Sequence, residues 1–431
     1  MEIRCPIHGS MYFSEGEVAV LEAIEFQRLR SIKQLGFAEF SFPGGTHTRY
    51  LHSVGACHIA GLAFDSIFRV YPFSKPSVKT RFREVLRLAT LLHDVGHGPL
   101  SHTTEKVMPL LSQLNIQIYQ TSNDPSLVKP TRRANHEDYT IKFITESSIA
   151  KEIMSHFQDI KPAHVACLIE RSLPPPDDFF IDKGTDFRPI LSQIVSSELD
   201  ADRMDYLERD SYFCGTNYGK IDLHWILQNL TFQRFDGKMY LALNRRALYT
   251  FDDFLISRHH MNLMVYCHHK SIIFEEMLNL YLSAKDCEYQ LPAQLGEYVK
   301  YNDNHLVEHL SQSTNQWARR ISQKQPYRVL IELHNQADQQ KIDMIHKALT
   351  NQGIHGIVSS SKTRLSKYHS MSSDDLASQI YVVDIFDRWE QPTPIGQTTE
   401  IFRRYEGTRI IDRIYVSPEN FAEAETILTK L

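Results

Sequence analysis

The segment LLHDVGHGPLSH, at residues 91–102, holds the densest group of side chains in this chain that could do chemistry. An apolar run places His93 and Asp94 side by side, and two glycines and a proline then break the helical pattern. Neighbouring residues on a helix point about 100° apart, so an adjacent pair of ligands suits an ion lying across a helix end. A lone His-Asp pair is more often a solvated helix end, but His97 and His102 follow closely. The segment therefore predicts a metal-binding or catalytic site.

Two further segments supply side chains of the same kinds. The segment GGTHTRYLHS, at 44–53, contributes His47, Arg49 and His52. The segment SSELDADRMDYLERDS, at 196–211, contributes Asp202, Tyr206 and Asp210, with Arg203 beside the first of them. The spacing i, i+4 and i+8 places the last three on one face of a helix. Alone, such a stripe would be an ordinary charged helix face, but beside the other two segments it predicts a shared site.

Five stretches with apolar residues at helical spacing must position these side chains. They span residues 16–36, 50–70, 79–93, 190–211 and 249–285, the last being the longest. Residues 121–135 are polar, and residues 173–189 contain three consecutive prolines, so both are predicted to be loops. The three chemical segments therefore lie on or beside predicted helices.

The pattern changes in the C-terminal quarter of the chain. Short β-branched and aromatic runs at 327–334, 380–385 and 411–416 predict strands. A helical stretch at 336–352, a Ser-rich loop at 359–374 and a helix from Pro418 onward accompany them. We expect a mainly α protein with a helical domain at 1–322 and a smaller C-terminal α/β domain at 323–431.

The composition is that of an ordinary globular protein, with 42% hydrophobic and 23% charged residues. No apolar run reaches about 18 residues, so we expect no transmembrane helix. The N-terminal residues lack a basic region followed by an apolar stretch, so we expect no secretory signal. Six cysteines without a CxxC pair argue against a disulfide framework and fit a cytoplasmic location. The net charge of −5 gives no general attraction to nucleic acid. The 21 histidines matter only where they cluster.

Taken in order, these segments resemble the dNTP triphosphohydrolase branch of the HD superfamily, which includes bacterial dGTP triphosphohydrolases and the vertebrate SAM-and-HD-domain enzyme. The resemblance runs through IRCPIHG, EFQRLRSIKQLG, FPGGTHTRYLHSVG, LLHDVGHGPLSH, NHE at 135–137, DADRMDYLERD and SRHHMNLMVYCHH at 257–269. It covers nearly all of the first 280 residues, whereas the α/β tail matches only loosely. It implies an HD-domain helical core and metal-dependent hydrolysis of dNTPs to deoxynucleoside and triphosphate.

The metal ligands that the resemblance implies are His52, His93, Asp94 and Asp202. Imidazole and carboxylate ligands together suit iron, manganese or zinc better than calcium. We expect one such divalent ion per chain, together with Mg²⁺ on the substrate phosphates. The metal would lower the pKa of a bound water and so make a nucleophile near neutral pH.

The resemblance also implies catalytic and phosphate-binding residues. The expected acid–base and phosphate-handling set is His97, His102 and His136, with Glu105 and Glu137 placed to orient the imidazoles. The arginines expected to grip the triphosphate are Arg49, Arg203 and Arg258. The family more often has lysine where Arg203 stands, and arginine reads phosphate as a fork rather than as a point charge. We expect His102, backed by Glu105, to protonate the departing 5′-oxygen.

A deoxyribose pocket is implied as well. By the resemblance, Gln34 and Asp210 hold the 3′-OH, while Leu35 and Tyr266 leave no room for a 2′-OH. Tyr206 and His268 complete the expected substrate-binding set. Without the resemblance, the leucine and the tyrosine would both be predicted to be core residues.

Two positions depart from the family pattern: Cys5 replaces the acid of RDPIHG, and Ile24, near Glu22, replaces a usual proline. The need for a nucleotide activator, the base preference and the native metal are left open. Two alternative functions remain open besides dNTP hydrolysis. One is a phosphohydrolase for another nucleotide or for single-stranded nucleic acid ends, and the other is a non-catalytic regulatory HD module. A homo-oligomer, dimer or higher, is expected from the family habit.

Overall fold

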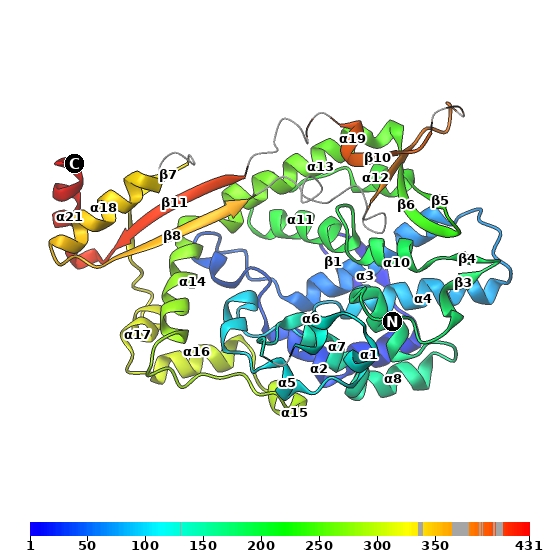
Figure 1. Cartoon of the computed structure of the whole chain (residues 1–431), viewed down its shortest axis with the longest axis horizontal. Helices are drawn as coiled ribbons and strands as arrows, with labels where there is room; N and C mark the ends of the chain where they lie inside the picture. The colour runs from blue at the N-terminus through cyan, green and yellow to red at the C-terminus, as the bar shows by residue number, and fades with distance from the viewer. Residues whose placement is uncertain are drawn as a thin grey trace.

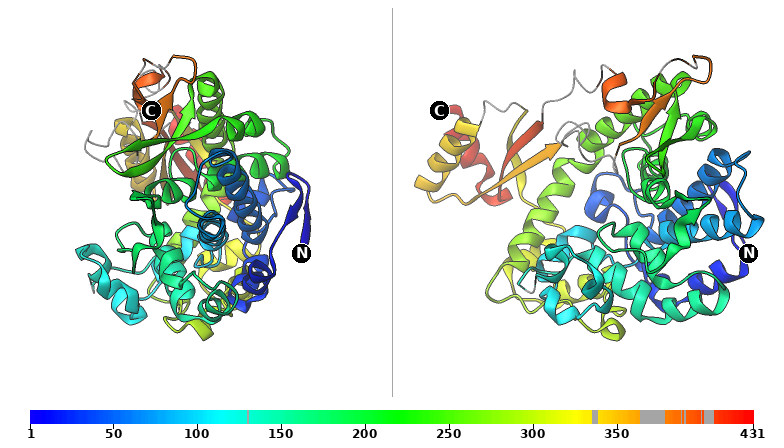
Figure 2. Two further views of the ribbon diagram at one scale, coloured as in Figure 1. Left: turned by 90° about the vertical axis from the view of Figure 1, so that its right-hand side faces the viewer. Right: turned by 45° about the vertical axis from the view of Figure 1, so that its right-hand side comes forward.

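The structure is a computed structural model that describes residues 1–129, 131–334, 339–363, 379–387, 389, 391–399, 401 and 408–431. A helical body makes up most of the molecule, and a small sheet with two helices lies at one end of it (Figures 1 and 2). The predicted fold class, mainly α with a smaller sheet-containing C-terminal region, is confirmed.

Three packed helices form the centre of the body. Helix α3 (Arg49–Ile67) packs against α4 (Pro76–Leu92) and against α11 (Ala201–Phe213). Helix α3 is buried on almost every side, which explains its nearly continuous apolar and small residues. The stretches predicted at 50–70 and 79–93 correspond to α3 and α4.

The N-terminal segment is more broken than its periodicity predicts. A hairpin of β1 (Glu2–Cys5) and β2 (Gly9–Tyr12) comes first. Helix α1 (Glu15–Glu22) follows, and a capping box between Ser14 and Glu17 fixes its start. Extended backbone at Ala23 then separates α1 from α2 (Ile24–Gln27). The predicted helix at 16–36 is therefore two short helices followed by a 3₁₀ turn.

The remaining helices of the body surround these elements. They are α5 (Leu111–Leu114), α6 (Pro125–Val128), α7 (His136–Glu146), α8 (Ser148–His156), α9 (Pro162–Ile169), α10 (Arg188–Val195), α12 (Leu223–Asn229), α15 (Leu295–Tyr298), α16 (Asp303–Gln312) and α17 (Gln316–Ser322). The segment predicted as a loop at 121–135 contains the one-turn helix α6. The predicted loop at 173–189 contains the two-residue strands β3 (Ile181–Asp182) and β4 (Thr185–Asp186).

The long periodic stretch at 249–285 is interrupted near its middle. Helix α13 (Leu248–Met261) runs into a π-helical turn at Asn262–Tyr266, and α14 (His269–Leu282) follows. A π-helical turn shifts the side chains that follow it relative to a regular helix and is often found at functional sites. Here the turn ends on Tyr266, a predicted substrate-binding residue.

A mixed sheet flanks α10 and includes part of the C-terminal quarter. Its order is β10 (Thr393–Pro394), β9 (Tyr381–Val383), β6 (Lys238–Asn244), β4 and β3, and β5 (Leu230–Phe235) pairs with β6 as a hairpin. Strand β9 was predicted as part of the C-terminal α/β domain, but it runs parallel to β6 of the body. The short helix α19 (Ile395–Thr398) lies beside it.

The end module is a three-stranded antiparallel sheet with the order β7 (Arg328–Leu333), β11 (Arg409–Val416) and β8 (Gly356–Thr363). Helices α18 (Gln339–Asn351) and α21 (Phe421–Thr429) pack against it around a separate small apolar cluster that includes Ile342, Leu349 and Ile414. Residues 359–363 were predicted to be loop, but they belong to β8, and the rest of that prediction lies outside the described residues.

Within the described residues, no helix combines the length and the hydropathy that crossing a membrane requires.

Candidate metal and catalytic site

Four predicted ligands from three helices meet at one point, and we call His52, His93, Asp94 and Asp202 the metal cluster. His52 lies in the first turn of α3, His93 ends α4, and Asp202 lies in the first turn of α11, which Asp200 caps. Nε2 of His52 is 2.9 Å from Oδ1 of Asp202, and Nε2 of His93 is 3.5 Å from the same oxygen. The Asp94 carboxylate lies 3.5 Å from His93 Nε2 and 3.7 Å from His52 Nε2.

The hydrogen bonds of the two imidazoles fit metal ligands. Nδ1 of His52 donates to Asp205 Oδ2 at 2.8 Å, and Nδ1 of His93 donates to the Thr90 carbonyl at 2.7 Å. With the proton on Nδ1, each Nε2 carries a lone pair. Both Nε2 atoms are buried and have no hydrogen-bond partner among the described residues, although carboxylate oxygens lie close by. Such an arrangement, with Nδ1 held and Nε2 free, is that of metal-binding histidines.

The charges in the metal cluster also favour the binding of a cation. Burial alone would lower the pKa of His52, but Asp202 and Asp205 raise it to about 10. Burial would raise the pKa of Asp94, but Arg49 and the neighbouring histidines His93 and His97 hold it well below its usual range. Several carboxylates therefore stay ionised in a buried place, which a bound divalent ion would neutralise.

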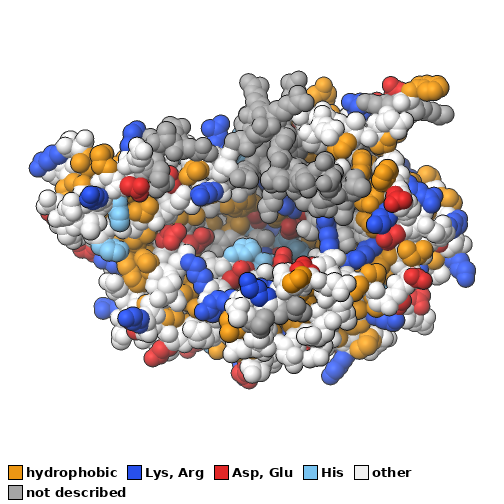
Figure 3. Space-filling model, viewed as in Figure 1, with side chains coloured by type: hydrophobic (Ala, Val, Ile, Leu, Met, Phe, Trp, Pro, Cys, Tyr) orange, Lys and Arg blue, Asp and Glu red, His pale blue; other side chains and the backbone are white. Residues whose placement is uncertain are grey.

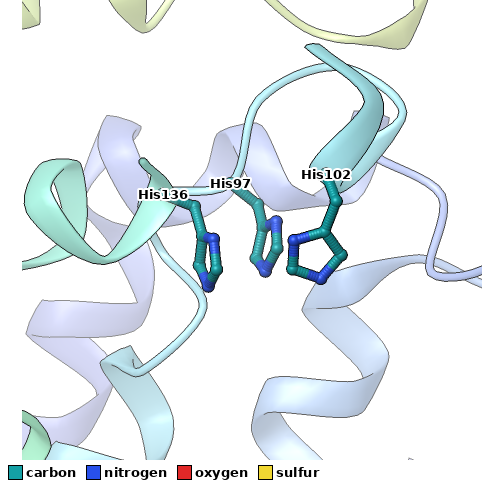
Figure 4. A group of neighbouring side chains, drawn as sticks. All are labelled: His97, His102 and His136. Carbon is teal, nitrogen blue, oxygen red and sulfur yellow. The ribbon is translucent and has the colours of Figure 1, made fainter. Parts of the chain in front are cut away.

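A second group of imidazoles, the histidine trio of His97, His102 and His136, lies next to the metal cluster (Figure 4). The rings of His97 and His136 are stacked, with centroids 3.9 Å apart and planes at 13°. In parallel rings the in-plane nitrogen directions run side by side and do not converge on one ion at about 2.1 Å. In Figure 4 the far ring nitrogens of the trio face the same side. The trio is therefore better suited to donate to several oxygens of a phosphate than to chelate a metal.

Glu105 is shared by two members of the trio. Its Oε1 accepts from Nδ1 of His136 at 2.6 Å and from Nδ1 of His102 at 3.1 Å. Burial would raise the pKa of Glu105, but these two histidines lower it to about 2. Burial, together with Arg49 and His136, lowers the pKa of His97. The sequence predicted that Glu137 orients the His136 ring. Among the described residues, the carboxylate that accepts from His136 is instead that of Glu105.

Two adjoining cavities open beside these groups. The first has a volume of about 360 Å³, and its lining includes His93, Asp94, Asp202, the histidine trio, Glu137 and Tyr206. The second, of about 230 Å³, is lined by Leu35, Ser101, Tyr266, Ser271 and Glu275 among others. Gln34, Arg49 and His102 line both. Figure 3 shows histidine side chains gathered in a hollow of this face. Three members of the metal cluster, His93, Asp94 and Asp202, therefore border the first cavity. Of the predicted sugar-binding residues, Gln34, Leu35 and Tyr266 border the second, whereas Asp210 lines neither.

The three predicted phosphate-binding arginines are each held by partners. Arg49 donates to Ser101 Oγ at 3.0 Å and forms an ion pair with Asp94. Arg203 is paired with Asp200, the residue that caps its own helix. The guanidinium of Arg258 makes a fork with Glu198, at 2.9 and 3.1 Å. Of these three arginines, Arg49 lines the two cavities.

The predicted sugar-binding residues are joined by hydrogen bonds. The Tyr266 hydroxyl donates to Asp210 Oδ2 at 2.8 Å, and His47 Nε2 donates to Asp210 Oδ1 at 2.7 Å. The buried side-chain oxygen of Gln34 has no hydrogen-bond partner in the part of the chain that the structure describes, so it can accept a hydrogen bond from a ligand hydroxyl. His268 instead contacts Ser41 Oγ at 2.8 Å and is not among the residues that line either cavity.

Several residues that support the site were not singled out from the sequence. Arg28, from the QRLR segment, donates to the carbonyls of Val95 and His97, at 2.8 and 2.7 Å, and so fixes the backbone between the two groups. Gly96 has no room for a side chain, since a Cβ there would lie 2.1 Å from the His136 carbonyl oxygen. Asp205 lies one helical turn after Asp202, so the sequence already places it on the same face of the helix as that predicted ligand.

Two parts of the chain match known protein families. Residues 49–210 match the HD domain, and residues 221–356 match an HD-associated region. The chain therefore contains an HD domain, as its motifs predicted, and an HD-associated region follows it.

Related sequences include an uncharacterized protein of Mycoplasma pneumoniae, 33% identical over 280 residues that cover 64% of this chain and 58% of the relative. The Bacillus subtilis protein YwfO is 32% identical over 57% of this chain and 46% of its own length. Deoxynucleoside triphosphate triphosphohydrolase SAMHD1 of Gallus gallus is 25% identical over 88% of this chain and 62% of its own length. The matched part of this chain thus covers between 46% and 62% of the length of these three relatives.

Two solved structures share the fold. A hypothetical protein from Aquifex aeolicus superposes with a TM-score of 0.75 at 24% identity, over 99% of both chains. A phosphohydrolase from Bacteroides thetaiotaomicron superposes with a TM-score of 0.68 at 19% identity, over 96% of this chain and 99% of the other. At these identities the likeness describes the fold.

Proposed function

We propose that this chain is a metal-dependent phosphohydrolase that converts deoxynucleoside triphosphates to deoxynucleoside and triphosphate. The observation that carries the proposal is the pair of adjoining cavities. One joins the metal cluster to the histidine trio, and the other is bordered by Leu35 and Tyr266. The relatives named as dNTP triphosphohydrolases in chicken, mouse and Dictyostelium support this substrate class.

In this proposal His52, His93, Asp94 and Asp202 hold a divalent transition metal such as iron, manganese or zinc. When bound, such an ion supplies Lewis acidity and lowers the pKa of water, which provides a nucleophile near neutral pH. Asp94 must then rotate from its ion pair with Arg49 or be shared between that cation and the metal. Mg²⁺ would accompany the substrate phosphates rather than the protein.

The protein's own groups would handle charge and protons. The guanidinium of Arg49 and the imidazoles of His97 and His136 face the first cavity and would donate hydrogen bonds to phosphate oxygens. His102 lines both cavities, so it lies where the α-phosphate and the 5′-oxygen of a bound nucleotide would meet. Its Nδ1–H is held by Glu105, which leaves Nε2 to carry the proton for the departing 5′-oxygen.

The second cavity would take the sugar. Gln34 and Asp210 would hold the 3′-OH, and Leu35 with Tyr266 would close the space beside C2′. A ribonucleotide would have to bury its 2′-OH there without a partner, at a cost of about 1–3 kcal/mol. Arg203, Arg258 and Tyr206 are proposed to act around the triphosphate, and His268 beside the nucleoside. A homo-oligomeric assembly is part of the same proposal.

The test is a product assay on each of the four dNTPs with Mn²⁺, using the wild-type protein and Asp202→Ala. The proposal expects triphosphate and deoxynucleoside in equal amounts from the wild type and neither from the variant. Release of pyrophosphate or of phosphate would contradict it. Cleavage of another nucleotide or of single-stranded ends, with dNTPs untouched, would favour the alternative substrates. No cleavage of any of these, with metal bound, would favour a non-catalytic HD module.

A further inference from the structure

The turn of the N-terminal hairpin lies directly behind the metal cluster. His8, between β1 and β2, is nearly buried, with a side chain 5% exposed. Its Nε2–H donates to Oδ1 of Asp205 at 2.6 Å. The other oxygen of the same carboxylate accepts from Nδ1–H of His52 at 2.8 Å. His8, Asp205 and His52 therefore form a continuous chain of hydrogen bonds that ends at a member of the metal cluster.

We propose that His8 is a positioning residue for the metal centre, acting through Asp205 on the orientation and basicity of His52. This inference rests on the proposed function, because it requires a metal on Nε2 of His52. It gives a role to the IRCPIHG segment, which the proposed reaction does not otherwise use.

Asp205 is saturated with donors, and His8 supplies one of them. Arg209 donates through Nε to Oδ2 at 2.8 Å and through Nη2 to Oδ1 at 2.7 Å. With His8 and His52, the carboxylate accepts four hydrogen bonds, which is about its full capacity. Asp205 is fully buried, so its four donors are protein groups rather than water. Without His8, Oδ1 would keep only the Arg209 Nη2 donor, so Arg209 alone would fix the position of the carboxylate against His52.

The packing around this chain leaves little freedom. A Cβ at Gly55 would lie 2.0 Å from Asp205 Oδ1 and 2.3 Å from Arg209 Nη2. Gly55 lies one helical turn after His52, so α11 can place its carboxylate behind the imidazole because α3 has no side chain there. Nη1 of Arg209 also contacts Cys5 Sγ at 3.5 Å. The hairpin thus touches the arrangement at two points, and His8 is the one that reaches the carboxylate.

The experiment compares His8→Leu with His8→Gln, whose amide N–H can take the place of Nε2–H. Protein stripped of metal by a chelator is titrated with Co²⁺, and both the dissociation constant and the visible absorption spectrum are recorded. Loss of a partner that orients a metal-binding histidine typically costs about 10–100-fold in metal affinity. We expect that loss, with a changed cobalt spectrum, for His8→Leu, and wild-type affinity within a few-fold for His8→Gln.

A matched control is His58→Ala. The His58 ring lies beside that of His8, with centroids 6.0 Å apart, but it is not part of the hydrogen bonds that join His8 to Asp205 and Asp205 to His52. This variant should bind Co²⁺ like the wild type. The thermal transition of each metal-free variant shows whether it folds. If His8→Leu does not fold, His8→Asn replaces it, because its shorter side chain cannot reach Asp205, and the same loss of affinity is expected.

If folded His8→Leu or His8→Asn bound Co²⁺ with the affinity and spectrum of the wild type, the role of His8 would be overturned and the proposed function would stand. Equal losses in His8→Gln and His8→Leu would also overturn the role of His8, because the hydrogen bond would then not be the cause. A wild-type protein that binds neither Co²⁺ nor Mn²⁺ would instead overturn the proposed function, and this inference with it.

Discussion

Oε1 of Glu105 lies 2.6 Å from Nδ1 of His136, a shorter distance than its 3.1 Å to Nδ1 of His102. One carboxylate therefore orients two imidazoles that could each carry the proton for the leaving group. The two differ in environment, since the His102 side chain is 69% exposed and that of His136 is 17% exposed. An exposed imidazole can exchange its proton with solvent after each turnover, which favours His102 as the general acid.

We predict that His102→Ala keeps its metal and still binds dNTP, while kcat falls by about 100-fold or more. The alkaline limb of the pH–rate profile should flatten, because that limb reports deprotonation of the acid. Metal analysis and steady-state kinetics between pH 6 and 9 measure both. If His136→Ala shows this loss and His102→Ala does not, the two roles are exchanged. If neither variant changes the limb, the general-acid assignment is wrong.

The metal cluster predicts about one transition-metal ion per chain. His93→Ala and Asp94→Ala should each lose metal and activity together, because each removes one of four expected ligands. Elemental analysis of the purified proteins measures the metal, and His102→Ala is the control that should retain it. Undiminished metal in both His93→Ala and Asp94→Ala would show that the ion binds elsewhere.

The sugar cavity predicts discrimination against ribonucleotides. Tyr266→Ala should narrow the difference between dGTP and GTP hydrolysis, which we expect to be roughly tenfold to a hundredfold in the wild type. Tyr266→Phe keeps the ring but removes the hydroxyl that bonds to Asp210, so it should keep the discrimination. The ratio of kcat/KM for the two substrates is the measurement. Equal wild-type rates on dGTP and GTP would exclude this gate.

The end module contacts the segment that follows Tyr266. Nη2 of Arg413 donates to the Cys267 carbonyl at 2.8 Å, and the Tyr415 hydroxyl donates to the His269 carbonyl at 3.2 Å. We predict that Arg413→Ala raises KM for dNTP by about tenfold, since a hydrogen bond from a charged group is worth about 1.5–3 kcal/mol.

Arg328→Ala, which removes an arginine that stacks on Phe421 in the same module, is the control and should leave KM unchanged. An unaltered KM in folded Arg413→Ala would mean that the module does not brace the sugar pocket. We also expect the end module to contribute to the assembly of a homo-oligomer, and the mass of the same variants in solution tests that role. Truncation at residue 322 is a poorer test, because it would also strip β9 from β6.

Glu275 predicts a pH-dependent stability. Burial and the neighbouring Glu276 raise its pKa from an ordinary value near 4.5 to about 7, although His102 acts in the opposite direction. Below pH 4.5 the carboxyl is protonated in both folded and unfolded chains. Between pH 4.5 and 7 the unfolded chain loses this proton first, so the folded state loses stability as the pH rises. Glu275→Gln should therefore raise Tm relative to the wild type at pH 8 and leave it nearly unchanged at pH 4.5.

Differential scanning fluorimetry at the two pH values measures this, and the exposed Glu308→Gln is the control for removing a negative charge. A Tm difference of the same size at both pH values would contradict the expected ionisation of Glu275.

The local patterns of this chain indicated element types better than partners. The run IYVVDI predicted a strand, and β9 is one, but it pairs with β6, about 140 residues earlier in the chain, as well as with the nearby β10. Residues 359–363 are serine-rich and predicted a loop, yet pairing with β11 makes them a strand. Strand formation depends on cross-strand neighbours, so a polar segment can be recruited by a partner that local propensity does not reveal.

The sequence by itself determined the HD domain, the mainly helical fold and the segments that carry the chemistry. These follow from helical periodicity and from short motifs, in which spacing along the chain sets which side chains share a helix end. Only the tertiary structure decided that Glu105 serves two histidines, that Asp205 is held by His8 and Arg209, and that the end module touches Cys267. Most of those contacts join elements distant in sequence, and their side chains meet only when the helices pack, because most buried polar groups need a hydrogen-bond partner.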